Sequence, residues 1–353
     1  MNPSRRQFLE AATLAGMGGF FGRFPIVSAA DAKVTAGMVR FRPEIEPLVQ
    51  LLELTSRDRL LEEIGQRIKC GLSCRDVVAA TLLAGIRNIQ PRPVGFKFHA
   101  VLVVNSAYLA SLNSPDCDRW LPIFWALDQF KASQARDVEE GDWTMPSVFE
   151  SAVPTADKAC SIFTTAMDAW DVECADAAAA GLARGVGAQQ VFDLMCRYGA
   201  RDYRDIGHKA IYVANSWRTL QTIGWQHAEP VLRSLSYALL SHNEESPAKR
   251  DDLADRPGRK NLERLREIRA AWEGGTWEAG TTTEMLTTLR TATWDEASGK
   301  AVELLNRGSS PQALWDAMFE YAAELLMRSP GIVTLHASTT TNALHYAFQH
   351  AAN

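Results

Sequence analysis

The sequence lacks most of the short motifs that identify a known chemistry. Its 353 residues contain no H-E-x-x-H zinc motif, no P-loop and no G-x-S-x-G nucleophile turn. The Gly185-Val186-Gly187 segment lacks the third glycine of a dinucleotide-binding fingerprint. The only acidic residue three before a histidine is Asp205, before His208, which argues against a di-iron carboxylate centre in a helical bundle.

The chain also has no C-x-x-C pair and no block of like charge. Its six cysteines, Cys70 to Cys196, therefore indicate neither a zinc ribbon nor a haem attachment site. Two interpretations of them stay open, buried free thiols or one or two disulfides. The formal net charge of −5 argues against a nucleic-acid partner.

The N-terminus has the order of regions found in export signals. Ser4 to Leu9 reads S-R-R-Q-F-L, which resembles the core of twin-arginine signal peptides, and a short apolar stretch from Ala11 to Phe21 follows. Small residues before Asp31 provide a cleavage site. We expect residues 1–30 to be a signal read by the twin-arginine translocase, with a periplasmic or secreted mature protein of charge about −7 and no stable membrane span.

Apolar residues recur at three- and four-residue spacing along most of the chain, for example from Leu48 to Ile68. This period predicts amphipathic helices. The best strand candidate, Val101 to Val104, is equally consistent with a buried helix. The sequence therefore predicts one all-α domain over residues 31–353.

Three segments resemble one another and predict helical repeat units packed around a shared core. Gly71 and Gly308 each precede a histidine by 28 residues and an asparagine by 34. We expect both glycines to end a helix in the left-handed conformation. The expected units cover about 57–120, 157–242 and 294–353, and the charged stretch of about 243–293 is expected to connect the last two.

Histidine is scarce, with seven in the chain, yet His99 and His336 occupy the same repeat position and His208 lies one step away from it. Packing of the units would bring the three together. Such a cluster suits iron, copper or zinc, or an axial ligand for haem. The alternative is that each histidine only hydrogen-bonds a neighbouring backbone group and holds the unit together.

The repeated asparagines are Asn105, Asn215 and Asn342, and we expect them to contribute to cofactor binding. The residues three positions further on share a helical face with them; these are Tyr108, Arg218 and His345. Tyr108 and His208 are the expected acid–base groups, because imidazole titrates nearest to neutral pH.

The His99-Ala100 segment with Asn105, and Asp205-Ile206-Gly207-His208 before a long apolar helix, resemble the histidine-bearing helices of questin oxidase-like proteins. The resemblance covers about a third of the chain. That family is α-helical and includes Baeyer–Villiger-type oxidases of aromatic polyketides. The resemblance implies that His99, His208 and His336 face a common pocket.

These patterns favour a periplasmic metal- or haem-dependent oxidoreductase acting on a small, possibly aromatic molecule. Two alternatives remain. One is a non-catalytic scaffold that binds a partner on the concave face of its helical repeats. The other is a cofactor-free lyase or hydrolase.

Overall fold

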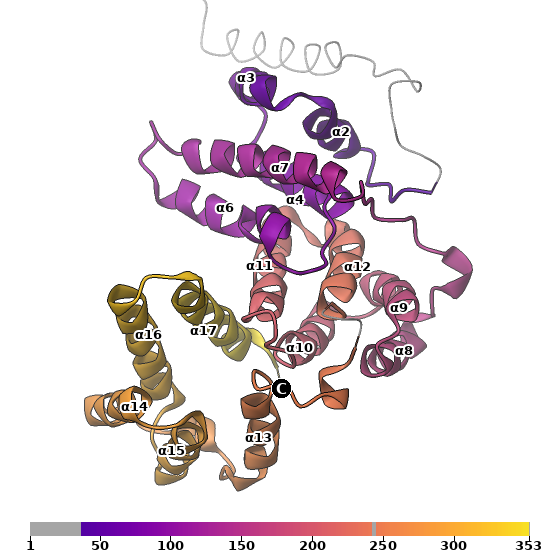
Figure 1. Cartoon of the computed structure of the whole chain (residues 1–353). Helices are drawn as coiled ribbons and strands as arrows, with labels where there is room; N and C mark the ends of the chain where they lie inside the picture. The colour runs from indigo at the N-terminus through magenta and orange to yellow at the C-terminus, as the bar shows by residue number, and fades with distance from the viewer. Residues whose placement is uncertain (1–36, 242–244, 353) are drawn as a thin grey trace, which may run out of the picture. The chain divides into compact units, whose positions relative to one another are not determined.

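The computed structural model describes residues 37–241 and 245–352, and the described part is all-α, as the sequence predicts. It contains sixteen α-helices and six short 3-10 helices, with no β-strand in the described ranges (Figure 1). All of these helices belong to one compact unit, Val39–Asn353. The expected signal peptide, residues 1–30, lies outside the described residues.

The first half of the chain supplies the helices that surround the centre of the main core. Their bounds are α2 Glu46–Leu54, α3 Arg57–Lys69, α4 Cys74–Asn88, η1 Phe96–Phe98, α5 His99–Leu102, α6 Val104–Asn113, α7 Leu121–Glu139, η2 Glu150–Ala152, α8 Ala156–Ala169 and α9 Val172–Gly185.

The second half supplies the remaining helices. Their bounds are α10 Ala188–Gly199, α11 His208–Ile223, η3 Trp225–His227, α12 Ala228–Leu239, η4 Pro247–Lys249, α13 Arg256–Arg264, η5 Leu265–Glu267, η6 Trp272–Gly274, α14 Ala279–Thr291, α15 Trp294–Arg307, α16 Pro311–Arg328 and α17 Ile332–His350.

Local sequence signals fix several helix starts. The Ser73 side chain accepts a hydrogen bond from the backbone N–H of Asp76 and caps α4, and Asp171 caps α9 in the same way. Thr293 and Glu296 form a reciprocal capping box at the start of α15. These side chains satisfy backbone N–H groups that have no partner within the helix.

The two repeated glycines end helices as predicted. Gly71 follows α3 with φ of 100°, and Gly308 ends α15 with φ of 98°. Both values lie in the left-handed region, where a Cβ costs about 1 kcal/mol. In each of the three similar segments, two helices precede the helix that carries the histidine: α3 and α4 before α5, α9 and α10 before α11, and α15 and α16 before α17.

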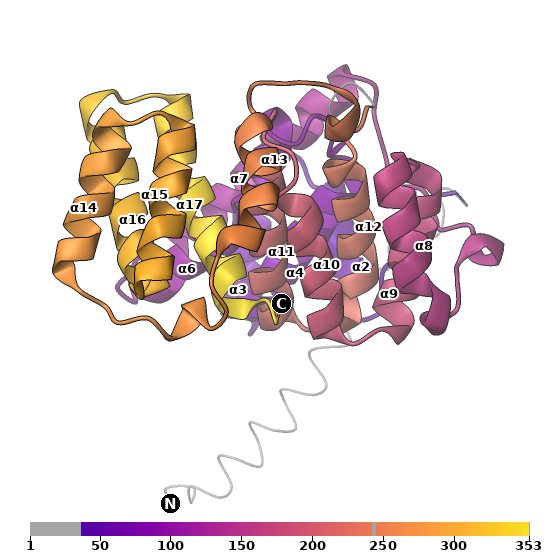
Figure 2. The same ribbon diagram turned by 90° about the horizontal axis from the view of Figure 1, so that it is seen from below.

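Two apolar clusters are present, and α17 is in contact with the helices of both. The larger cluster includes residues of α4, α9, α11 and α12, together with Ala343 and Tyr346 of α17. The smaller cluster lies among α14, α15 and α16, which stand together in Figure 2. Because α17 packs on α11 and on α16, it joins the C-terminal helices to the main core. The stretch 243–293, expected as a connector, itself contains α13 and α14.

The cysteines are free thiols, of which Cys70 and Cys117 are exposed. The free-thiol interpretation is therefore confirmed, but the thiols are not buried as expected, because the other four are only half-buried. In the described ranges, no helix combines the length and the apolar character that a membrane crossing needs.

Candidate metal centre

His99, His208 and His336 meet at one point, although 237 residues separate the first from the last. The Nε2 atom of His208 lies 3.0 Å from Nε2 of His99 and 2.8 Å from Nε2 of His336. The ring centres of His99 and His336 are 6.1 Å apart. One metal ion with bonds of about 2 Å to imidazole nitrogen can therefore reach all three residues.

Each histidine uses its other ring nitrogen in the same way. Nδ1 of His99 lies 2.8 Å from the carbonyl oxygen of Phe96, and Nδ1 of His208 lies 2.7 Å from that of Asp205. Nδ1 of His336 lies 2.6 Å from the carbonyl oxygen of Ile332. A carbonyl oxygen only accepts, so Nδ1 carries the proton and donates it in all three rings.

This pattern leaves a lone pair on each Nε2 atom, and the three lone pairs point into the same small space. Two acceptor nitrogens about 3 Å apart repel one another unless a cation or a proton lies between them. A backbone carbonyl that holds the second ring N–H is also the usual way in which proteins orient a metal-binding histidine. The three histidines are thus arranged as metal ligands.

The turn before His208 is held in a conformation that few residues adopt. Ile206 has φ of 49°, and the next residue, Gly207, has φ of 91°. Left-handed backbone is a true outlier for a β-branched residue. The Thr340 hydroxyl of α17 donates to the Ile206 carbonyl oxygen at 3.2 Å, and a Cβ on Gly207 would collide with Thr340. The turn that carries His208 is therefore fastened to the helix that carries His336.

A second glycine packs directly against the His208 ring. Gly95 has φ of 132°, and a Cβ there would lie 3.1 Å from Cε1 of His208. Phe96, which follows, has φ of 47° and supplies the carbonyl oxygen that holds His99. One short segment thus positions His99 and limits the movement of His208.

Buried ion pairs anchor the turns on which two of the histidines stand. Lys209 is fully buried and donates at 2.5 Å to Asp202, which also binds Arg204. Burial alone would raise the pKa of Asp202, but hydrogen bonds from Arg204 and Lys209 lower it to about 2. These contacts fix the backbone on both sides of His208.

The His99 side has a matching anchor. Lys97, two residues before His99, lies 2.6 Å from Asp137, and both side chains are buried. Asp137 also accepts the backbone N–H groups of Gln90 and Trp143. This carboxylate connects the η1 turn to α7 and to the loop that follows it.

Burial, together with the smaller effects of the neighbouring His336 and His99, lowers the pKa of His208 to about 4. His208 and His336 are 7% and 6% exposed, whereas His99 is only partly buried. In the described ranges the cluster of potential metal ligands consists of these three residues. On an ion held by three imidazoles, a fourth coordination position would stay open for water.

Among the described residues, no hydrogen bond joins the other predicted site residues to the three imidazoles. Tyr108 is half-buried on α6 and packs against the main core, and no hydrogen bond joins it to the three histidines in the described part of the chain. Asn105 is buried, and its Nδ2 has no partner there. Asn215 and Asn342 meet at Arg218, whose Nη1 lies 3.2 and 2.9 Å from their Oδ1 atoms.

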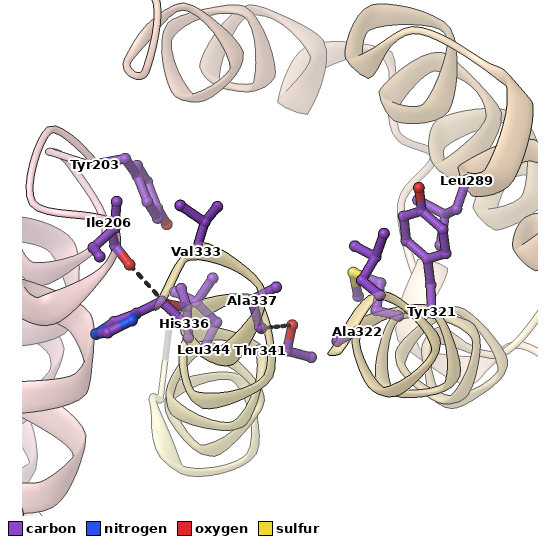
Figure 3. A pocket seen from close by; sticks show the side chains of 13 residues that line it. Tyr203, Ile206, Leu289, Tyr321, Ala322, Val333, His336, Ala337, Thr341 and Leu344 are labelled. Atoms are coloured by element: carbon purple, nitrogen blue, oxygen red, sulfur yellow. Dashed lines mark hydrogen bonds between the residues drawn. The ribbon is translucent and has the colours of Figure 1, made fainter. Parts of the chain in front are cut away.

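An apolar pocket of about 440 Å³ lies beside α17, between the Tyr203–Ile206 turn and helices α14 and α16 (Figure 3). His336 is among the residues that line it. Figure 3 shows the imidazole of His336 directed away from Tyr321 and Leu289 on the opposite wall. The pocket therefore adjoins the helix that carries His336, on the side away from its imidazole.

Comparisons with protein-family models, with curated proteins and with solved structures found no match for this chain.

Sequence reasoning identified the three histidines that meet but missed the groups that position them. Gly95, Lys97, Lys209 and Thr340 belong to no motif. The sequence did offer one indication of these groups, because a lysine lies close to each of two histidines: Lys97 precedes His99 by two residues, and Lys209 follows His208. Arg218 was expected to share a face with Asn215, and their hydrogen bond confirms this.

Proposed function

We propose that this protein is a metal-dependent enzyme whose single ion is bound by His99, His208 and His336 and which acts on a small molecule. The observation that carries the proposal is the contact of three Nε2 atoms, each in a ring whose Nδ1–H is already donated to a carbonyl oxygen. A purely structural role would not require three acceptor atoms to face one another.

The spacing favours a single ion over haem. Two axial nitrogens on a haem iron stand about 4 Å apart on opposite sides of the porphyrin, given metal–nitrogen bonds of about 2 Å. The Nε2 atoms of His208 and His336 are 2.8 Å apart, which leaves no room for a porphyrin between them. Two nitrogens on one tetrahedral ion lie about 3.3 Å apart, close to the observed spacing.

Copper is the ion we propose, which makes the activity that of an oxidoreductase. A site of neutral imidazoles, without a carboxylate, suits copper and zinc better than magnesium or calcium, and copper binds most tightly among the divalent first-row ions. In the reaction the substrate gives up two electrons and two protons, and dioxygen takes them to become hydrogen peroxide. The accessible side of His99 leaves a position for dioxygen or substrate.

A second candidate is a zinc-dependent hydrolase or lyase. The observation in its favour is the donor set itself, because three histidines and one open position make a catalytic zinc site. There the ion would lower the pKa of a bound water to about 7 and so supply hydroxide at neutral pH.

The N-terminal residues favour a cellular location for this activity. We propose that the protein is exported through the twin-arginine route, which carries folded proteins, so that the ion is bound before the chain crosses the membrane. The support is the Ser4-Arg5-Arg6 segment with the apolar and small residues after it.

The deciding experiment is elemental analysis of protein exported by its own signal, followed by reconstitution of chelator-treated protein with copper or with zinc. We expect about one ion per chain. Copper with oxygen consumption and peroxide release on a panel of small molecules supports the oxidoreductase, and zinc with hydrolysis supports the second candidate. Protein that binds neither ion would contradict both.

A further inference from the structure

Arg218 lies on the same helix as His208, two to three turns further along. Its guanidinium is hydrogen-bonded to neutral amides and to no carboxylate of the described residues. Nη1 donates to Oδ1 of Asn215 and to Oδ1 of Asn342. The guanidinium carbon stands 4.0 Å from the centre of the Tyr346 ring. The Tyr346 hydroxyl in turn donates to Gln221 at 2.9 Å, which holds the ring in place.

The two fully buried arginines of the described ranges pair with acids. Arg87 is bound by Glu46 and Glu53, and Arg233 by Asp176. Arg218 is half-buried and has no ion pair with any described residue. Burial lowers the pKa of Arg218, because removing a charge from water costs free energy when no opposite charge compensates it.

The surroundings position this charge without neutralising it. The two amide oxygens occupy Nη1, which leaves Nη2 and Nε of the planar fork without a hydrogen bond to a described residue. Guanidinium groups bind carboxylates through two such parallel N–H groups. The geometry is that of a prepared site for an anion.

The same three elements hold Arg218 and the three histidines. Asn215 follows His208 by seven residues, two turns along one face of α11, and its Nδ2 donates to the carbonyl oxygen of Leu102 in α5. Asn342 follows His336 on α17. With a rise of about 1.5 Å per residue, Arg218 lies about 15 Å along α11 from His208.

We propose that Arg218 binds the carboxylate of an organic acid and that this acid is the substrate of the metal centre, with its reacting end directed toward the histidines. The second half of this statement rests on the proposed function, and the first does not. The substrate class is thus an organic acid long enough to span about 15 Å, the rise of α11 between His208 and Arg218.

The test measures benzoate binding by titration calorimetry, with benzamide as the uncharged analogue, on both metal-loaded and chelator-treated protein. We expect benzoate to bind in both forms and benzamide to bind in neither. Arg218→Gln should weaken benzoate at least tenfold, and Arg218→Lys should retain part of the affinity. Asn342→Asp, at an exposed position, should also abolish binding because it supplies the missing carboxylate to Arg218.

Arg184→Gln is the matched control, because Glu150 and Glu229 already occupy that guanidinium and its loss should not change benzoate binding.

Unchanged binding in folded Arg218→Gln, or no benzoate binding at all, would overturn the proposal. So would sulfate that displaces benzoate at equal concentration, since this indicates an adventitious ion only. Benzoate binding by a protein that takes up no metal would leave the anion site standing and remove the metal function.

Discussion

Nε2 of His208 lies 2.8 Å from Nε2 of His336, and both rings have already given their Nδ1–H to backbone carbonyl oxygens. The two atoms that face each other are therefore acceptors. Residues 128 positions apart in the sequence meet in this way only because α17 packs along α11. A third acceptor, from His99, completes a set that one cation can satisfy.

Loss of any one histidine should empty the centre. His99→Ala, His208→Ala and His336→Ala are each expected to lower the metal content of purified protein by a large factor. The double variant of His99 and His336 should lose little more metal than either single variant. The two imidazoles left in a single variant already hold the ion poorly, as does the one left in the double variant. Elemental analysis of folded protein measures the effect.

His350→Ala is the control for these variants. Its Nδ1 also lies near the carbonyl oxygen four residues before it, at 2.9 Å, but its Nε2 has no hydrogen bond to another histidine in the described part of the chain. Metal content should not change. If the three site variants kept their metal and each only destabilised the fold by about 1–3 kcal/mol, additively, the histidines would be structural.

Gly95→Ala should weaken metal binding through the His208 ring. The added Cβ would lie 3.1 Å from Cε1, so the ring must shift. Groups that orient a ligand typically contribute about 10-fold to 100-fold in metal affinity. Gly71→Ala is the matched control, because Gly71 has a similar positive φ and nothing near its Cβ position. Equal effects of the two variants on affinity, measured by chelator competition, would show that backbone strain alone is responsible.

Asp202→Asn should destabilise the fold strongly. It leaves the fully buried Lys209 ammonium without its closest carboxylate, and breaking a buried pair in this way costs about 3–5 kcal/mol. Asp202→Asn combined with Lys209→Met should recover part of the loss, because the buried ammonium that the single variant leaves without its closest carboxylate is then absent. Urea unfolding of the metal-free protein measures both, and a double variant no better than the single one would contradict this account.

His227 should make the stability depend on pH near neutrality. Burial lowers its pKa, and the charges of Arg42 and Arg75 lower it further, against the opposing effect of Glu44 and Asp76. As the pH falls below about 6.5, the unfolded chain takes up a proton on this residue before the folded protein does. The folded state therefore loses stability in that range.

His227→Gln should remove this contribution, so that the unfolding free energy falls less steeply between about pH 7 and pH 5 than in the wild type. His350→Gln, at an exposed position, is the control. An unchanged slope in His227→Gln would show that His227 titrates alike in both states.

Export should require both N-terminal arginines. Arg5→Lys combined with Arg6→Lys keeps the charge but removes the guanidinium pair, and the precursor should stay in the cytoplasm. Arg23→Lys, outside the motif, should be exported as usual. Fractionation and immunoblotting check the outcome, and periplasmic accumulation of the double variant would reject the twin-arginine assignment.

The sequence alone determined the helical class, the two left-handed glycines and the three histidines. These features are local, because apolar periodicity, helix caps and a repeated spacing depend on neighbours along the chain. Tertiary structure decided which atoms meet. The contact between α11 and α17 brings His336 to His208 and Asn342 to Arg218. The spacing of residues in the sequence does not predict where a side chain points when its helix packs against another that is distant in the chain. Gly95, Lys209 and Thr340 therefore acquire their roles only in the folded chain.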